Sequence, residues 1–310
     1  MEPKVLSIQS WVCHGYVGNK CAVFALQHLG IEVDPINSVH LSNNTAYPTW
    51  KGESLTPNKL GDLFQGLEDN HLTSDYTHVL TGYNNSVETL HTVLKIVKKL
   101  KSENPNLIYV CDPVLGDNNE LYVPKDLVEV YRNEVIPNAD YIFPNQTEVE
   151  FLTGIKIKND QDALKAIDEF HKMGVKNVVI TSLFFESNPN DIIVIGSTIN
   201  ENNNNNNSNN NNKYNQFKIK VGPKFNDYYT GTGDLLSSLL LGWSIREPTD
   251  LSLVCEKAIS ILYNIISETH NSKKSIPSKK EKQYYELRLV QSRKFIENSE
   301  IRFKAEKLCG

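Results

Sequence analysis

A glycine-rich turn with an acid behind it, Gly231-Thr232-Gly233-Asp234, stands directly before the apolar run Leu235–Trp243. Two glycines allow the backbone to turn tightly and to approach a ligand closely. The apolar run has helical spacing, so the turn would present free N–H groups and the positive end of a helix dipole to an anion. Asp234 would lie beside that anion, where a carboxylate can accept a proton from a hydroxyl that attacks a phosphoryl group.

The same stretch also fits a capped core helix that binds nothing. In that interpretation Thr230 or Thr232 is the N-cap, and Asp234 interacts favourably with the helix dipole. A G-x-G-D match is short and weak when taken alone. The choice between the two interpretations therefore depends on what the rest of the chain places nearby.

Three further acids follow predicted strands. Asp112 precedes a proline, which holds the acid extended at the strand tip. Asp117 lies five residues further on, and Glu148 falls in the first turn of a helix after Asn145. Carboxylates from separate strand ends beside an anion site suit Mg²⁺, which takes few protein oxygens together with phosphates and water. The alternative is three unrelated solvated or capping carboxylates.

Strands and helices alternate from Val5 to Ser182, which predicts a parallel sheet with helices on both faces. The predicted strands are Val5–Ser10, Ile31–Val39, Tyr76–Thr81, Leu107–Cys111, Tyr141–Phe143 and Val178–Ile180, and the predicted helices are Ala22–Leu29, Thr56–Leu67, a helix capped by Ser86, and Asp160–Met173. Ligands of such sheets lie beyond the carboxyl ends of the strands. The polar residues of interest follow those ends: Ser10, Gly82-Tyr83, Asp112, Asn145 and Thr181.

The sequence of the last third of the chain predicts a different order of strands and helices. Ile192–Ile195 and Phe217–Val221 are expected to form antiparallel strands, and Leu251–Glu268 a long helix. Between the two strands, residues 201–213 hold a run of asparagines that predicts a disordered insertion. Residues 273–282 predict a basic loop, and Glu286–Val290 an edge strand or a packed terminal segment. We expect one domain over residues 1–310.

Composition excludes several classes of protein. A net charge of -5 argues against nucleic acid or an anionic membrane surface as the main partner. No apolar stretch approaches the roughly 18 residues that span a bilayer. The five cysteines are scattered without a C-x-x-C pair, which disfavours a disulfide framework or a zinc site and indicates a reduced, cytoplasmic protein.

At the level of whole motifs, the chain resembles the pyridoxal kinases of the ribokinase superfamily. The motifs occur in collinear order from Val5 to about Ile301, and they are Ser7-Ile8-Gln9-Ser10, Gly15-Tyr16-Val17-Gly18-Asn19, Asn37-Ser38-Val39, Leu80-Thr81-Gly82-Tyr83, Tyr109–Asp117, Pro144-Asn145-Gln146, Val179-Ile180-Thr181-Ser182, Gly231–Asp234 and Glu286-Leu287-Arg288. The resemblance implies a ribokinase-like three-layer α/β/α fold with a mostly parallel central sheet. It also implies ATP-dependent phosphorylation of the 5′-hydroxymethyl group of pyridoxal, pyridoxine and pyridoxamine by a homodimer. The implied ions are Mg²⁺, in some relatives Zn²⁺, and a monovalent cation such as K⁺.

Carried over position by position, the resemblance assigns roles to individual residues. Asp234 would be the general base, and the amides of Gly231, Thr232 and Gly233 the anion hole. The residues implied to contact the vitamer are Ser10, Val17, Thr45, Tyr83 and Asp234. Those implied to contact the nucleotide are Asn145, Thr181, Ser182, Tyr229, Thr230, Gly231, Thr232 and Tyr122. Tyr122 belongs to an implied flap formed by Asp117–Tyr122. Asp112, Asp117 and Glu148 would surround the metal.

The chain departs from the family pattern in three places. Phe143 stands where relatives commonly have a threonine, Tyr228-Tyr229-Thr230 is bulkier than usual, and the flap is short. Two other functions remain open from the sequence: a sugar or hydroxymethylpyrimidine kinase of the same fold, and a catalytically silent vitamer-binding protein. Hydroxyl and aromatic groups at Ser10, Thr45 and Tyr83 favour a flat heterocyclic substrate, and the intact acids favour catalysis.

Overall fold

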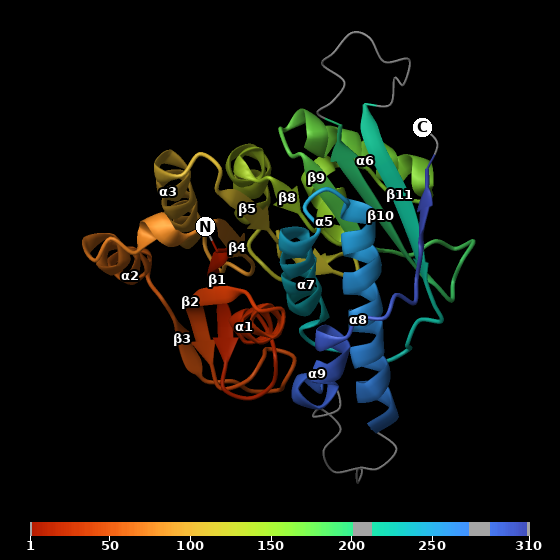
Figure 1. Cartoon of the computed structure of the whole chain (residues 1–310), viewed down its shortest axis with the longest axis horizontal. Coiled ribbons are helices and arrows are strands. Elements are labelled where there is room, and N and C mark those ends of the chain that lie inside the picture. The colour runs from red at the N-terminus through yellow and green to blue at the C-terminus, as the bar shows by residue number, and fades with distance from the viewer. Residues whose placement is uncertain (1, 201–212, 273–285, 309–310) are drawn as a thin grey trace.

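The computed structural model describes residues 2–200, 213–272 and 286–308 (Figure 1). The asparagine run at 201–212 and the basic loop predicted at 273–282 lie outside the described residues, so both predictions stay untested. Among the described helices, none combines the length and the apolar character that crossing a membrane requires.

One ten-stranded sheet runs through the described residues in the order β12-β11-β10-β9-β8-β5-β4-β1-β2-β3. Its strands are β1 (Lys4–Val12), β2 (Glu32–Leu41), β3 (Gly52–Ser54), β4 (His78–Thr81), β5 (Ile108–Cys111), β8 (Tyr141–Ile142), β9 (Asn177–Leu183), β10 (Ile192–Ile199), β11 (Tyr214–Val221) and β12 (Ala305–Lys307). The strands from β2 to β9 pair in parallel, whereas β3 and the strands from β10 to β12 pair antiparallel at the two edges. A separate hairpin is formed by β6 (Gly116–Asp117) and β7 (Glu120–Leu121).

Helices cover both faces of this sheet, which gives three layers. One face carries α2 (Pro57–Asp69), α3 (Val87–Glu103), α4 (Asp126–Val130), α5 (Gln146–Thr153) and α6 (Asp160–Lys172), with short turns η1 (Thr73–Asp75), η2 (Tyr131–Val135) and η3 (Ile136–Asn138). The other face carries α1 (Asn19–His28), α7 (Thr232–Arg246), α8 (Leu251–Ser272) and α9 (Leu289–Glu297). The predicted α/β/α architecture with a mostly parallel centre is confirmed.

Alternation along the strands explains why the sheet has two cores. On β5, Tyr109 and Cys111 face the helices from α2 to α6, whereas Val110 faces α1 and α7. The same alternation places Ile142 in the first core and its neighbour Phe143 in the second. Successive side chains of a strand point to opposite faces, so continuous apolar runs are what a sheet buried on both sides requires.

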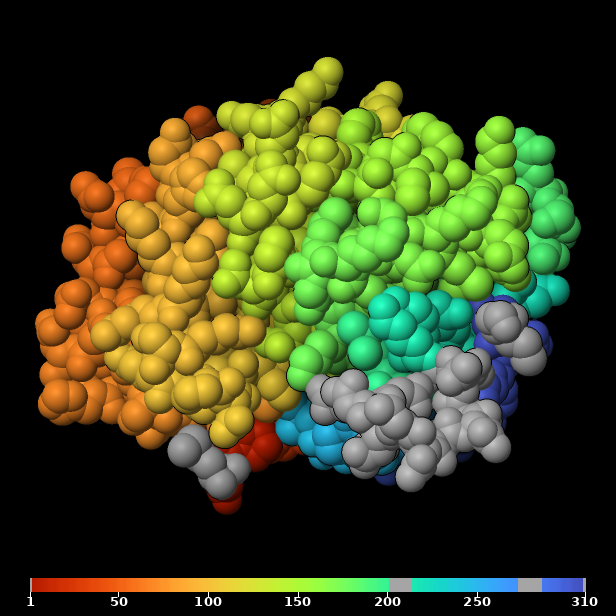
Figure 2. Space-filling model, turned by 90° about the horizontal axis from the view of Figure 1, so that it is seen from above, coloured from red at the N-terminus to blue at the C-terminus, as the bar shows by residue number. Residues whose placement is uncertain are grey.

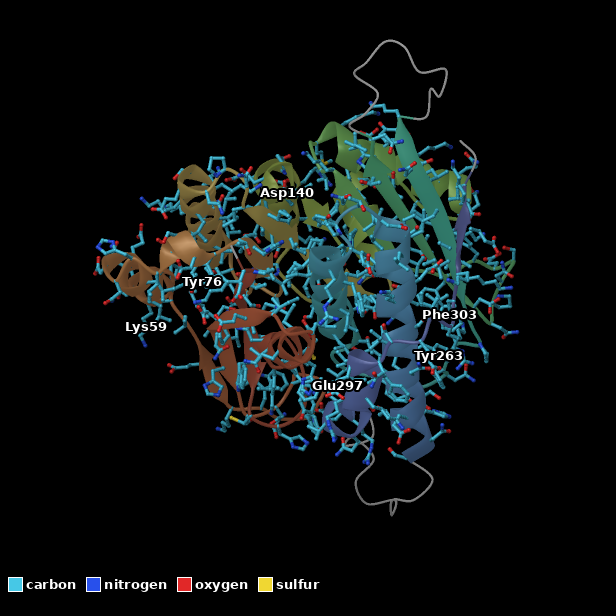
Figure 3. All side chains as sticks on the ribbon, in the orientation of Figure 1. Lys59, Tyr76, Asp140, Tyr263, Glu297 and Phe303 are labelled. Carbon is cyan, nitrogen blue, oxygen red and sulfur yellow. The ribbon has the colours of Figure 1, made fainter. Side chains whose placement is uncertain are left out.

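Chain order largely follows position along the sheet. Seen from above, the first third of the chain covers one end of the molecule, and the segment from β9 to β11 covers the other (Figure 2). Polar and aromatic contacts tie neighbouring segments of the sheet together and tie α8 to the segment before β12. The Tyr76 hydroxyl donates to Asp34 at 2.8 Å, and Asp140 accepts from the Tyr109 amide at 2.8 Å. Tyr263 of α8 packs edge-on against Phe303 with ring centroids 4.9 Å apart (Figure 3).

Most predicted elements occur within a few residues of their expected bounds, and the exceptions are short or polar. The segment Glu286–Val290 is the packed segment of the two alternatives and not an edge strand: Leu287 and Leu289 are buried, Glu286 makes one parallel bridge with Thr230, and α9 begins at Leu289. The elements β3, α4, β12 and the β6–β7 hairpin were not predicted, since each spans five residues or fewer and shows no apolar period.

The Ser86 cap provides a test of how the sequence encodes α3. The Ser86 hydroxyl accepts a hydrogen bond from the Thr89 amide at 3.2 Å, as predicted for an N-cap. Ser86→Ala should therefore lower the free energy of unfolding by about 1 kcal/mol, measured as a lower urea midpoint at fixed protein concentration. The control is Ser102→Ala in the last turn of the same helix, where an alanine should change stability by less than about 0.5 kcal/mol. Equal midpoints for the two variants would contradict the capping role.

Candidate active site

Backbone hydrogen bonds bring the carboxyl ends of the parallel strands to one level. The Gly82 amide donates to the carbonyl of Ile8, and the Asp112 amide donates to that of Thr81 at 2.9 Å. Further along the sheet the Thr181 amide donates to the carbonyl of Pro144 at 2.9 Å. The segments that follow β1, β4, β5 and β8 therefore meet at one edge, as the sequence predicts for a ligand site.

The turn before α7 reaches the same edge. Gly231 is the N-cap of α7 and has a φ of 82°, in the left-handed region that favours glycine. A Cβ at this position would also overlap the carbonyl oxygen of Tyr16, so the turn is seated directly on the loop after β1. The alternative caps, Thr230 and Thr232, are wrong, because the N-cap is Gly231 and no side chain in the described part of the chain caps this helix. The amides of the first turn are thus left without side-chain partners, as an anion site requires.

Asp234 lies in the first turn of α7 and faces the loop after β1. Burial raises the pKa of its carboxyl group, and a hydrogen bond from the Gly18 amide opposes that rise. Gly18 in turn packs on Ser10, because a Cβ on Gly18 would contact the Ser10 hydroxyl and carbonyl oxygens. The structure therefore brings Asp234, Gly18 and Ser10 together, and Asp234 keeps partial exposure to solvent.

A second acid lies close to Asp234. Asp112 is 6% exposed, and burial together with the Asp234 charge raises the pKa of Asp112 to about 7, although a hydrogen bond from Ser237 acts in the opposite direction. Two carboxyl groups this close resist being ionised together. A cation or a bound group with positive charge would relieve that repulsion.

Glu148 is held by backbone amides. Its carboxylate oxygens accept from the Leu115 amide at 3.0 Å and from the Asn145 amide at 2.8 Å. Burial, followed by the Asp112 charge, raises the pKa of Glu148 well above its usual range, while these amides act in the opposite direction. Glu148 also completes a capping box with Asn145 at the start of α5, so it fixes the segment that carries Asp112.

The predicted flap is the β6–β7 hairpin. Asp117 accepts from the Asn118 amide at 2.8 Å, and Asn118 and Asn119 turn the chain with φ values of 51° and 64°. After the hairpin comes Tyr122, which is 57% exposed. Desolvation, and then the charges of Glu148, Asp112 and Asp234, raise the pKa of Tyr122. Its hydroxyl therefore lies within electrostatic reach of all three acids.

The predicted metal residues do not form a complete ligand cage. Among the described residues, no three His, Cys, Asp or Glu side chains are grouped closely enough to hold an ion. Asp112 and Glu148 are coupled by charge, whereas Asp117 stands on the hairpin. This donor set fits Mg²⁺, which keeps several waters and takes its remaining oxygens from phosphate groups.

The predicted nucleotide residues occupy the strand ends on the far side of Asp112. Asn145 donates from its side chain to the Gly116 carbonyl at 2.8 Å, and the Thr181 hydroxyl donates to the Pro144 carbonyl at 3.3 Å. Ser182, the half-buried neighbour of Thr181, lies in the same strand, β9. Tyr229 is 6% exposed and directs its hydroxyl at His270, 2.9 Å away. The Tyr229 side chain is thus part of the second core, whereas its backbone leads into the turn at Gly231.

The predicted vitamer residues are spread over three loops. Val17 is half-buried and directly precedes Gly18. Thr45 is exposed in the loop after β2, and Tyr83 is half-buried after β4 with its pKa raised by burial. In the described part of the chain, neither Thr45 nor Tyr83 is hydrogen-bonded to Asp234, so these two residues lie outside the hydrogen-bonded group around the acid.

Sequence reasoning assigned no role to Ser237 or Glu286, and it included Tyr228 only in the bulky segment before the turn at Gly231. Ser237 stands three residues after Asp234, where the pair Ser237-Ser238 interrupts a run of leucines, and that polar interruption was a usable signal. Tyr228 is 56% exposed, and its pKa is raised by burial and by the charges of Asp117 and Asp234. Glu286 contacts the loops after β1 and β2 from the other end of the chain, which no local pattern indicates.

A protein-family model described as phosphomethylpyrimidine kinase matches residues 73–278 of the chain. That range includes the strand ends at Asp112 and Asn145 and the turn at Gly231. It leaves out β1, the loop that holds Thr45, and Glu286.

Relatives match the chain over nearly its whole length. A pyridoxal kinase of Dictyostelium discoideum is 94% identical over 99% of this chain and 100% of its own, and a pyridoxal kinase of Arabidopsis thaliana is 47% identical over 98% and 94%. A solved structure of pyridoxal kinase from Leishmania donovani, in complex with ADP and pyridoxamine, has a TM-score of 0.85 at 30% identity and covers 99% of both chains. The shared sheet, the turn at Gly231 and this full-length similarity place the chain in the pyridoxal kinase family.

Proposed function

We propose that this protein transfers the γ-phosphoryl group of ATP to the 5′-hydroxymethyl group of pyridoxal, pyridoxine and pyridoxamine. The observation that carries the proposal is the position of Asp234, which stands behind the left-handed turn at Gly231 and accepts a hydrogen bond from Gly18. An acid beside free helix amides suits an alcohol that attacks a phosphoryl group. The full-length similarity to pyridoxal kinases supports the choice of the vitamer as the alcohol.

In this mechanism the vitamer oxygen forms a bond to the γ-phosphorus as its proton passes to Asp234, and the bond to the β-phosphate oxygen breaks to leave ADP. The hydrogen bond from the Gly18 amide favours the ionised form of Asp234 and so opposes the effect of burial on its pKa. The amides of Gly231, Thr232 and Gly233 would donate to the oxygens of the transferred group as negative charge develops there. The hairpin with Tyr122 would close over the phosphates and exclude water.

We propose that Mg²⁺ is held by Asp112 and Asp117 together with phosphate oxygens and water, and that Glu148 acts through the segment that it fixes. The metal would neutralise charge on the phosphates. On the family resemblance we also propose a homodimer in the cytoplasm, with Zn²⁺ as a substitute metal and K⁺ as an additional ion. The Phe143 side chain is 3% exposed in the second core and offers no oxygen, so K⁺ would take its oxygens from backbone carbonyls or other side chains.

A second candidate function is a hydroxymethylpyrimidine kinase, which the family model favours by its description. The deciding experiment gives the purified protein ATP and, in turn, pyridoxal, hydroxymethylpyrimidine and a hydroxymethyl sugar, and measures ADP release. We expect pyridoxal to have the highest kcat/KM. Turnover of another substrate without turnover of pyridoxal would refute the proposal, and turnover of none would favour a silent vitamer-binding protein.

Asp234→Asn tests the proposed base. An amide of the same shape cannot accept the proton, so kcat at saturating ATP and pyridoxal should fall by about 10²–10⁴-fold. The matched control is Asp62→Asn on the exposed side of α2, which should keep wild-type turnover. Near wild-type kcat in the Asp234 variant would remove this residue as the base.

Substitutions at two glycines test the stability of the turn separately from its proposed phosphate binding. Gly231→Ala forces a side chain into the left-handed region and onto the Tyr16 carbonyl, so both the urea midpoint and activity should fall. Gly233 has no atom within 4 Å of an added Cβ. Gly233→Ala should therefore keep its stability while kcat/KM for ATP falls, because the methyl group enters the space proposed for the phosphates. Wild-type kinetics in Gly233→Ala would contradict the proposed phosphate position.

Asp112→Asn tests the electrostatic repulsion in the metal-free protein. A folded pKa of about 7, against about 3.9 in the unfolded chain, means that the folded state binds the extra proton between these values. Stability of the wild type should then fall as the pH rises from about 4 to about 7. With EDTA present, the variant should have the higher urea midpoint at pH 8, and this difference should nearly vanish at pH 4. A difference in urea midpoint that is the same at both pH values would show that the pKa of Asp112 is not raised.

A further inference from the structure

Glu286 lies where three segments that carry predicted site residues meet. One carboxylate oxygen accepts from the Tyr16 amide at 3.1 Å, and the other accepts from the Asn44 side chain at 2.7 Å. The backbone of Glu286 also pairs with Thr230 in a parallel bridge. Each of these partners is directly next to a predicted site residue: Val17, Thr45 and Gly231 respectively.

The residue that donates to Glu286, Tyr16, also contacts the turn at Gly231. Gly15 passes over the Glu286 carboxylate so closely that a Cβ at Gly15 would overlap it, and Gly15 has a φ of 86°. The next peptide offers its amide to Glu286, while the carbonyl oxygen of Tyr16 lies against Gly231. A displacement of the Tyr16 peptide would thus move the surface on which the turn at Gly231 is seated.

The contact with Asn44 continues into the loop after β2. Asn44 is 6% exposed, and its side-chain oxygen accepts from the Ala46 amide at 3.0 Å, which folds the loop around Thr45. Tyr47 of the same loop also lies near the carboxylate, since burial and then the Glu286 charge raise the pKa of Tyr47 to about 12. One carboxylate therefore fixes both loops on the vitamer side.

We propose that Glu286 is a positioning residue, which holds the loops at Tyr16 and Asn44 in a fixed relation to the turn at Gly231. Glu286 does not touch the reacting atoms. It acts by setting where the vitamer lies relative to the phosphate-binding amides, a relation on which the rate of transfer depends steeply. The inference rests on the proposed function, because it takes Val17 and Thr45 as vitamer contacts.

The principal variant is Glu286→Gln, which keeps the size of the side chain but replaces one acceptor by an NH₂ group that faces a donor. Loss of a hydrogen bond to a charged acceptor should lower kcat/KM for pyridoxal by about 10- to 100-fold. The dissociation constant of ADP, measured without vitamer, should change by less than about 3-fold. Asn44→Ala removes only the hydrogen bond that joins Glu286 to the loop after β2. It should also lower kcat/KM for pyridoxal without weakening ADP binding.

The matched control is Glu256→Gln. Glu256 is 8% exposed and accepts from the Ala305 amide at 2.8 Å and from Lys304 at 3.0 Å, so it ties β12 to α8 with the same kinds of bond. This variant should lose stability and keep the wild-type KM for pyridoxal. If Glu286→Gln and Asn44→Ala keep kcat/KM for pyridoxal within 2-fold, or weaken ADP binding equally, the positioning role is refuted.

Hydrogen exchange of the ligand-free protein separates failure of this inference from failure of the proposed function. In Glu286→Gln, peptides over residues 13–18 and 42–51 should exchange faster than in the wild type, whichever substrate the enzyme uses. Unchanged exchange in both peptides would refute the positioning role. Absence of pyridoxal turnover by the wild type, together with faster exchange in the variant, would refute the vitamer assignment alone.

Discussion

Parallel pairing of β1, β4, β5 and β8 is the constraint on which the site depends. Each strand is tied to its neighbour by backbone hydrogen bonds, so the residues that follow the strands arrive at one edge in a fixed order. That register places the backbone of Asp112 and Asn145, and side-chain contacts such as the bond from Asn145 to the Gly116 carbonyl then hold the edge together. A one-residue slip would turn each side chain to the opposite face and dissolve the site.

The site also stores electrostatic repulsion. Asp112, Asp234 and Glu148 have raised pKa values, first because they are buried, and for Asp112 and Glu148 also because a like charge is close. Amide donors oppose the effect at Asp234 and Glu148, whereas Asp112 has a serine hydroxyl. A site built this way favours ligands that bring positive charge with their phosphates, as a nucleotide bound with a divalent cation does.

Much of the fold could be predicted because its elements carry strong periodic signals. The continuous apolar run of β5 and the helical spacing after Ser86 identified their elements within one or two residues. The turn at Gly231 could be predicted from the sequence, because glycine has few other roles directly before a buried helix. The predicted N-cap of α7 was wrong, because a threonine on either side of Gly231 fits the usual N-cap preference equally well. Only the Tyr16 carbonyl shows why a glycine is needed at position 231.

What the sequence did not indicate are contacts between distant segments. Glu286 meets Tyr16 and Asn44 across 270 and 242 residues, and no local pattern encodes such a pairing. The β6–β7 hairpin is too short for an alternating pattern to emerge, although two successive asparagines in the left-handed region are a known turn signal.

The reach of Glu286 has a consequence for how the protein matures in the cell. A ribosome releases the loops at Tyr16 and Asn44 early, long before residue 286 leaves the exit tunnel. During that interval the two loops lack the carboxylate that fixes them, even if the sheet behind them has already formed. A nascent chain that stops short of Glu286 would therefore lack the carboxylate that joins the loops at Tyr16 and Asn44.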